Sequence, residues 1–117
     1  MFDIEFYEKE NGKVPVADFL DSLSHKNRAK VASDIWLLGN QGNLVGMPKS
    51  KPLKNGLFEL RSKFPDGISR IFYFFMKGNK IVMTNGFIKK TLKTPGNEIE
   101  TALKYKSDYE RRMTHEV

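Results

Sequence analysis

Basic side chains gather in the middle of the chain, where their types and spacing could act on a phosphate. Residues 49–93 carry eleven Lys or Arg against two Asp or Glu, whereas both flanking segments are slightly acidic. Arginine grips phosphate oxygens through paired N–H groups, and lysine adds a compact, mobile charge. This concentration predicts a polyanion, most simply nucleic acid, as the partner. The alternative is a solvated basic face without a ligand.

Arg70 is the most informative of these residues, because it stands inside the aromatic run "ISRIFYFFMK". Strand alternation places it on one face with Ile68, Phe72 and Phe74. We expect Arg70 either to hold a phosphate or to form an ion pair with Glu59 or Asp66. Arg61 belongs either to the same site or to the surface at a strand end.

Two adjacent lysines, Lys89 and Lys90, end the next predicted strand, and Lys93 lies just beyond. Alternation groups Lys89 with Met83, Asn85 and Phe87. Lysines of this kind either protect an exposed strand edge or handle a phosphate. Neighbouring positive charge disfavours the ammonium form of a lysine, which could then act as a base. Arginine stays charged and is left to hold the phosphate. Which of the two lysines is the base remains open.

Several other kinds of chemistry are not expected from this composition. The chain has no cysteine, which excludes thiol catalysis and Cys-ligated zinc and favours a cytoplasmic location. Its two histidines, His25 and His115, fall in a predicted link and in the tail, so neither a histidine acid–base pair nor a metal site is expected. No cofactor motif, signal peptide or membrane-length apolar segment is found.

The apolar spacing predicts the elements that must position these side chains. Residues 2–6 alternate as a half-buried strand does, and Pro15 suits the first position of a helix. Ser24 suits the N-cap of a second helix, and the short link predicts a helical hairpin over 16–38. A loop is expected between the second helix and residue 57, because it contains prolines and glycines.

Three apolar runs follow this loop and predict strands near 57–64, 68–77 and 80–88. Gly78-Asn79 is a hairpin signal between the last two strands. Thr94-Pro95 begins a final helix. The order β-α-α-β-β-β-α predicts one α+β domain over 1–117, with the helical hairpin packed on a small antiparallel sheet and a C-terminal helix.

Segment 51–103 resembles the HigB-like branch of the RelE/ParE superfamily of type II toxin–antitoxin toxins, which has relatives among prophage proteins. The resemblance rests on "LKNGLFELR", "SRIFYF" and "GFIKKTLKTPGNEIETA". It implies a RelE-like fold and a ribosome-dependent mRNA endoribonuclease, or mRNA interferase, that inhibits translation and growth. Such enzymes work without metal or cofactor. The RNA 2′-hydroxyl is the nucleophile, and the product carries a 5′-hydroxyl.

The resemblance also assigns residues and partners. It makes Arg61, Arg70, Lys89 and Lys90 the catalytic candidates. Together with the basic segment it predicts RNA-binding roles for Lys49, Lys51, Lys54, Glu59, Lys63, Phe87 and Lys93. Some superfamily members transfer protons through a histidine or a terminal tyrosine, and this chain has no suitably placed histidine, so the general acid stays open. The implied partners are translated mRNA and a HigA-like helix-turn-helix antitoxin, in a heterotetramer of two toxins and two antitoxins.

Two other functions are compatible with the sequence. One is a ParE-like poison of DNA gyrase on the same fold, although such proteins tend to lack the clustered basic site. The other is a non-catalytic module that binds nucleic acid. In the toxin interpretation, the antitoxin surface is expected to include the helical hairpin, residues 16–38.

Overall fold

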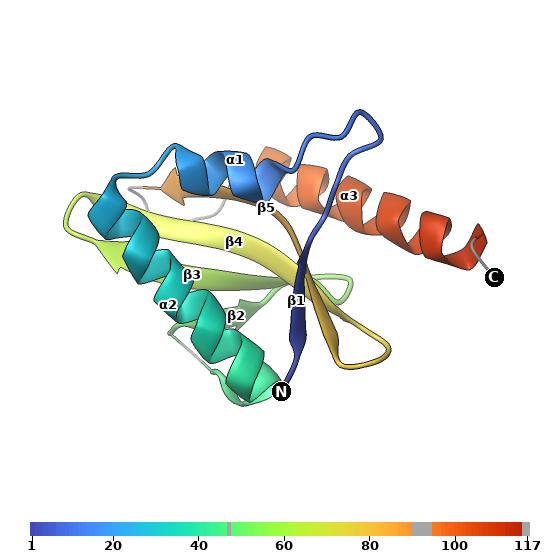
Figure 1. The fold of residues 1–117 in the computed structure, drawn as a ribbon, viewed down its shortest axis with the longest axis horizontal. Coiled ribbons are helices and arrows are strands. Elements are labelled where there is room, and N and C mark those ends of the chain that lie inside the picture. Colours follow the sequence, from blue (N-terminus) through green and yellow to red (C-terminus); the bar gives the residue numbers. More distant parts are fainter. Residues whose placement is uncertain (47, 90–94, 116–117) are drawn as a thin grey trace.

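A five-stranded sheet with helices on both faces forms the protein (Figure 1). The computed structural model describes residues 1–46, 48–89 and 95–115. The elements are, in chain order, β1 (Asp3–Phe6), α1 (Pro15–Asp21), α2 (His25–Gln41), the 3₁₀ turn η1 (Gly42–Leu44), β2 (Ser50–Pro52), β3 (Phe58–Phe64), β4 (Gly67–Met76), β5 (Lys80–Lys89) and α3 (Gly96–His115). The predicted α+β class is confirmed.

The sheet is mixed, which corrects the expected antiparallel sheet. Strands β2 to β5 form an antiparallel meander, but β1 runs parallel to β5, with Asp3 opposite Lys80. The spatial order is β1-β5-β4-β3-β2. Side-chain alternation along one strand is the same for parallel and antiparallel pairing, so the pattern of residues 2–6 contained no information on direction.

Strand β2 lies in a segment that was expected to be a loop. It is short and ends at Pro52, which has no N–H to donate to a ladder. Proline is tolerated here because β2 is the edge strand. The prolines and glycines around it therefore mark a sheet edge as well as the turns beside it.

Helices α1 and α2 cover one face of the sheet, as Figure 1 shows. Pro15 is the first residue of α1, and the Ser24 hydroxyl accepts a bond from the Asn27 N–H at 3.2 Å, so both predicted helix starts are confirmed. The buried core between these layers contains Val16, Val31, Leu38, Leu60, Ile71, Tyr73, Ile81 and Met83. Each fully buried apolar side chain of this size contributes about 1.5–3 kcal/mol.

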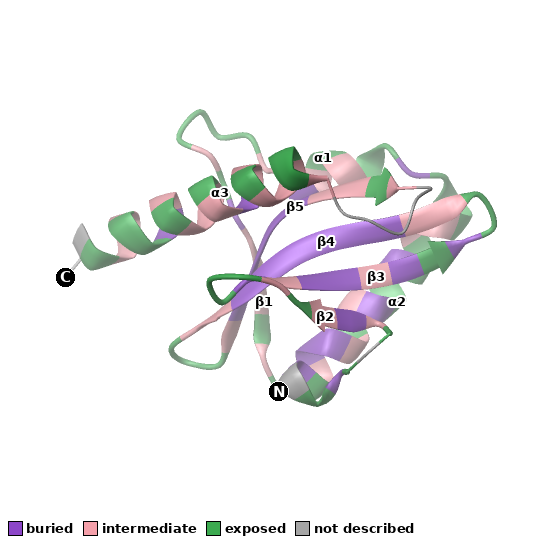
Figure 2. Ribbon diagram, turned by 180° about the vertical axis from the view of Figure 1, so that it is seen from behind, coloured by how far each residue is buried: buried purple, intermediate pink, exposed green. Residues whose placement is uncertain are grey.

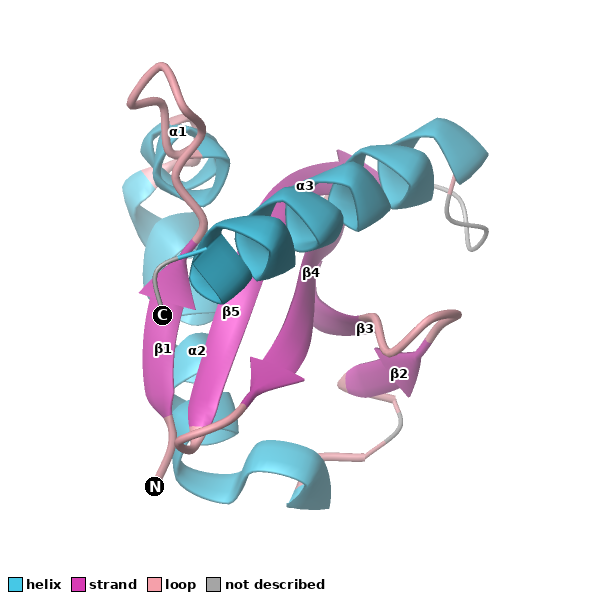
Figure 3. Ribbon diagram, turned by 90° about the vertical axis from the view of Figure 1, so that its right-hand side faces the viewer, coloured by secondary structure: helices cyan, strands magenta, loops and turns pink. Residues whose placement is uncertain are grey.

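Helix α3 crosses the opposite face (Figures 2 and 3). Its residues pack in two clusters. Ala102 lies against Leu57 and Phe72, and Tyr109 lies against Phe74 and Val82. Because both of its faces are covered, β4 is buried over most of its length (Figure 2).

An irregularity between β4 and β5 changes which side chains share a face. Ile71 pairs with Gly86 but Tyr73 pairs with Met83, so β5 carries one extra residue between these pairs. Met83 consequently lies in the core under α1 and α2, while Phe87 packs under α3. The expected grouping of Lys89 with Met83 is therefore wrong, because a bulge breaks strict alternation.

Gly86 fits this irregularity because no larger residue has room there. A Cβ at this position would lie 2.7 Å from Cδ2 of Phe19 on α1. Beyond it, β5 resumes its pairing with Phe87 opposite Arg70. The bulge therefore brings the end of β5 onto the same face as Arg70.

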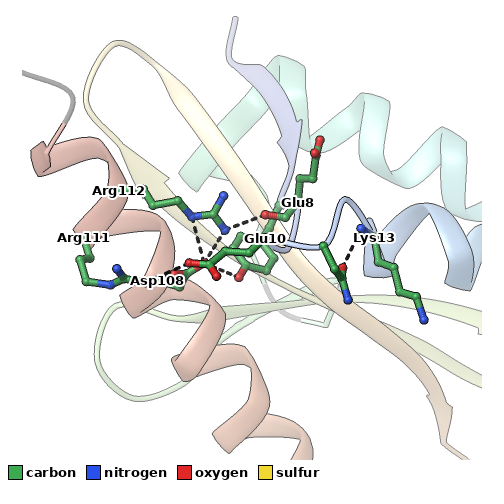
Figure 4. Close-up of polar contacts among 8 residues, drawn as sticks. Glu8, Glu10, Lys13, Asp108, Arg111 and Arg112 are labelled. Carbon is green, nitrogen blue, oxygen red and sulfur yellow. Dashed lines mark hydrogen bonds and ion pairs between the residues drawn. The ribbon is translucent and has the colours of Figure 1, made fainter.

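A polar cluster ties the C-terminal half of α3 to the segment after β1 (Figure 4). The Tyr7 hydroxyl donates to Oδ2 of Asp108 at 2.6 Å, and Nε of Arg112 donates to the same oxygen at 3.0 Å. Arg112 Nη2 also donates to the backbone oxygen of Glu8 at 2.7 Å. Arg111 forms a further ion pair with Asp108. These bonds hold the helix across the sheet.

The cluster makes part of the stability pH-dependent. The hydrogen bond from Arg112 and that from Tyr7 lower the pKa of Asp108 from 3.8 to about 2. A carboxylate with a depressed pKa in the folded state stabilises the protein above its unfolded pKa, and the contribution disappears as pH falls through the folded pKa. We expect Asp108→Asn to remove the part of the acid-induced loss of stability that falls between pH 3.8 and about 2.

Urea unfolding over a pH series measures this effect. The matched control is Glu100→Gln on the same helix, whose exposed carboxylate lies 4.0 Å from Nζ of Lys54. The control should keep the acid dependence of the parent protein. An Asp108→Asn variant with that same dependence would contradict the assignment.

Candidate functional site

Four basic residues share the face of the sheet that α3 partly covers. Arg61 on β3 stands directly opposite Arg70 on β4, and Arg70 stands opposite Phe87 on β5. In the next row of the same face, Lys63, Ile68 and Lys89 are opposite one another. We call Arg61, Lys63, Arg70 and Lys89 the basic end of the sheet. The sheet register thus brings together three of the four predicted catalytic residues.

The carboxylate of Glu59 lies at the centre of this group. Its Oε1 accepts bonds from Nε of Arg61 at 2.9 Å and from Nη1 of Arg70 at 3.1 Å. Glu59 and Arg70 are fully buried, whereas the Arg61 side chain is 20% exposed. Two like charges directly opposite each other in a sheet repel, and the shared carboxylate offsets this repulsion. The ion-pair alternative for Arg70 is confirmed.

The burial pattern separates the roles that these side chains can play. Arg61 reaches solvent, so its guanidinium is placed to contact a ligand. Arg70 and Glu59 are buried. Glu59 orients Arg61 through its hydrogen bond to Nε, and Arg70 holds Glu59 in place through their ion pair. Glu59 was expected to contact RNA, but the structure places its carboxylate between the two arginines.

The end of β5 supplies one more basic group and one aromatic ring. Lys89 is half-buried, and Lys90 and Lys93 lie outside the described residues. Phe87 packs against Phe72, with ring centroids 5.8 Å apart, in the cluster beneath α3. Packing within the protein therefore accounts for Phe87.

The remaining predicted RNA-binding lysines occupy the β2 side of the sheet. Lys51 stands opposite Glu59 and is half-buried. Lys54 is exposed in the turn between β2 and β3 and approaches Glu100 of α3. Lys49 and Lys63 line a pocket with Arg61 at the edge of β3. The predicted residues thus divide between the sheet face, the turn and this edge pocket.

Two residues of the pocket region were not predicted from the sequence as site residues. Lys30 lines the pocket from α2, and Asp34, one helical turn later, is buried and binds Lys49. A signal for Asp34 exists in the sequence. It follows Val31 by three residues and precedes Leu38 by four, so it falls on the buried stripe of the helix. A carboxylate on such a stripe requires a buried partner.

Neither a metal cluster nor a membrane helix is found in the part of the chain that the structure describes. Within residues 1–46, 48–89 and 95–115, no three His, Asp or Glu side chains lie close enough together to hold a metal ion. None of the helices in those ranges is long and apolar enough to span a membrane.

The Glu59 cluster yields a test of coupling. Removing one member of a buried ion pair leaves an uncompensated charge and costs about 3–5 kcal/mol. We expect Glu59→Gln and Arg70→Met each to lower the free energy of unfolding by about this amount. The double variant should lose less than the sum of the two, with a coupling energy of at least about 1 kcal/mol.

Urea unfolding of the four proteins in this double-mutant cycle measures the coupling. The exposed pair Lys54 and Glu100, 4.0 Å apart, supplies the control cycle. Its coupling energy should be near zero, because exposed ion pairs contribute little. Strictly additive losses at Glu59 and Arg70 would show that the two charges do not depend on each other.

Comparison with known proteins places the chain in a family. It matches the family described as phage-derived protein Gp49-like (DUF891) over residues 18–107. No curated protein matches it. This family falls in the RelE-related toxin–antitoxin group, in agreement with the resemblance seen in the sequence, while the HigB-like branch stays a prediction. The matched residues include the basic end of the sheet and the pocket region, and the chain belongs to the Gp49-like family of phage-derived proteins.

Proposed function

We propose that this chain is the toxin of a type II toxin–antitoxin pair of the HigB-like kind and cleaves translated mRNA on the ribosome. One observation provides the main support for this proposal. A partly exposed arginine, Arg61, is fixed by the buried Glu59–Arg70 pair on the same sheet face as Lys63 and Lys89. Such an arrangement offers a rigid phosphate contact beside lysines that can transfer protons.

The reaction that fits these groups is an internal displacement at phosphorus. The RNA 2′-oxygen forms a bond to the adjacent phosphorus as a base takes its proton, and the bond from phosphorus to the 5′-oxygen breaks. An acid donates a proton to that leaving oxygen. The products are a 2′,3′-cyclic phosphate and a 5′-hydroxyl. Every atom and proton is supplied by RNA and protein groups, so the proposed reaction uses neither a metal nor a cofactor.

Each residue has a defined part in this proposal. Arg61 contacts the non-bridging phosphate oxygens and stabilises the charge that develops on them. Arg70 and Glu59 are positioning residues, because they are buried and act through Arg61. Lys89 and Lys90 are the candidates for proton transfer. Lys51, Lys54 and Lys93 contribute charge along the RNA backbone.

A cognate antitoxin of the HigA-like helix-turn-helix kind completes the proposal, in a complex of two toxins and two antitoxins that forms in the cytoplasm. Its surface on the toxin includes α2. An apolar pocket of about 300 Å³ lies between β1 and α2, and the neighbouring Trp36 side chain is 69% exposed. An exposed tryptophan beside an apolar pocket is typical of a protein-binding surface.

Substitution of Arg61 tests the proposal. Loss of one contact to a developing oxyanion costs about 10²–10³ in rate, so Arg61→Ala should abolish growth arrest and mRNA cleavage in a translation extract. The control Lys104→Ala removes the same charge from an exposed position on α3 and should leave both activities intact.

Three outcomes are informative. Ribosome-dependent cleavage that disappears in Arg61→Ala but persists in Lys104→Ala supports the proposal. Growth arrest accompanied by gyrase-linked DNA breaks and intact mRNA would contradict it. So would cleavage by Arg61→Ala at the parental rate, since the arginine would then be dispensable.

A further inference from the structure

A basic pocket at the edge of β3 adjoins the arginine cluster on the sheet face and shares Arg61 with it. It measures about 390 Å³ and is lined by Lys30, Pro48, Lys49, Arg61, Lys63 and Ile68. Strand β2 pairs with β3 as far as Leu60, and the Lys49 carbonyl accepts a bond from the Arg61 N–H at 2.7 Å. Within the described residues, β3 beyond Arg61 has no partner strand on this side. Four of the six lining side chains are cationic, and they come from three separate parts of the chain.

A buried carboxylate under the pocket fixes one of its cations. Asp34 on α2 is 3% exposed and accepts bonds from Nζ of Lys49 at 2.7 Å and from Oγ of Ser62 at 2.6 Å. Nζ of Lys30 lies 3.5 Å from the same carboxylate. Burial alone would raise the pKa of Asp34, but the bonds from Lys49 and Ser62 and the nearby ammonium charges hold it below its ordinary value. The carboxylate is therefore ionised, and it offsets only one of the positive charges around the pocket.

The pocket lysines remain accessible to a ligand, although Lys30 and Lys49 both contact Asp34. The side chains of Lys30 and Lys49 are 45% and 31% exposed. Lys63 is exposed. Clustered, partly desolvated cations of this kind attract an anion. The pocket is nevertheless larger than a phosphate group needs, and Ile68 and Pro48 give it apolar walls.

We propose that this pocket binds a nucleotide of single-stranded RNA that neighbours the one being cut. Its phosphate lies among Lys30, Lys49 and Lys63, and its ribose and base lie against Ile68 and Pro48. This inference rests on the proposed function, since it assigns a second subsite to the same RNA. Arg61 supports the connection, because it lines the pocket and also belongs to the Glu59 cluster. One strand can thus contact both places in succession.

The probe for this subsite is a four-nucleotide RNA whose 2′-hydroxyls are methylated, which keeps the phosphates but blocks internal attack. It is titrated into the full chain, and the backbone amide signals are followed by NMR at several salt concentrations. The signals of Lys63 and Ile68 should shift on binding. Salt dependence then reports how many phosphates are neutralised, with a slope of roughly 0.7 for each on a single strand.

Two double variants with equal charge decide the matter. Lys30→Ala/Lys63→Ala removes two pocket cations, and Lys26→Ala/Lys104→Ala removes two exposed lysines outside it, so each lowers the net charge from +6 to +4. We expect the pocket variant to lose roughly 0.7 from the salt slope, which corresponds to the one phosphate in the pocket, and the control variant to keep the parental slope. The substituted lysines are exposed, and Lys30→Gln/Lys63→Gln serves as a second pocket variant if the alanine form folds poorly.

The pocket proposal and the nuclease proposal can fail separately. Equal affinity and equal salt slope in both double variants, with no shift at Ile68, would overturn the pocket proposal. In that case the pocket would be assigned to an acidic segment of a protein partner instead of RNA. The pocket variant would then cleave mRNA as the parent protein does. Conversely, the predicted loss of slope supports the pocket even if no mRNA is cut, because the methylated probe reports binding without chemistry.

Discussion

The buried carboxylate of Glu59 is the interaction on which the candidate site depends. Register places Arg61 and Arg70 directly opposite each other, and Glu59 accepts a hydrogen bond from each of them. Burying such ions costs several kcal/mol each, and well-packed apolar residues of similar volume often stabilise a protein as well or better. A contribution to stability therefore does not explain why this cluster lies in the sheet. The cluster is explained by its effect on Arg61, because it fixes the partly exposed guanidinium of that residue in one orientation.

A second buried carboxylate, that of Asp34, binds β3 from the opposite face of the sheet. On the face covered by α2, Asp34 accepts a bond from Ser62 of β3 and holds Lys49 at the edge of the sheet. On the face covered by α3, Glu59 of β3 holds Arg61. Strand β3 thus carries Arg61, which Glu59 holds on one face of the sheet. Through Ser62 it also binds Asp34, which holds Lys49 beside the strand.

Local sequence patterns predicted most of the fold. The starts of α1 and α2, the three long strands and the final helix followed from periodicity and from Pro15 and Ser24. The parallel pairing of β1 did not follow, since pairing direction depends on residues nearly eighty positions away. Strand β2 was hidden by Pro52, which only an edge strand tolerates. The bulge before Gly86 lies where β5 packs closely against Phe19 of α1, and no local pattern shows such a contact.

The candidate site was predictable in its composition and less so in its arrangement. The unusual position of Arg70 in an aromatic run indicated a charge that needs a partner, but identifying Glu59 as that partner required the register of β3 against β4. Asp34 was missed because its partners Lys49 and Ser62 lie outside α2, and Lys30 was missed because the pocket that it lines is formed by residues far along the chain.

The chemical ends of RNA cut on the ribosome give the most direct test of the central claim, that positioned arginine and lysine groups direct the RNA's own 2′-hydroxyl onto phosphorus. The account predicts a 5′-hydroxyl on the downstream fragment and a 2′,3′-cyclic phosphate on the upstream one. A 5′-phosphate would mean that water is the nucleophile, and it would contradict the mechanism even if the protein is a toxin.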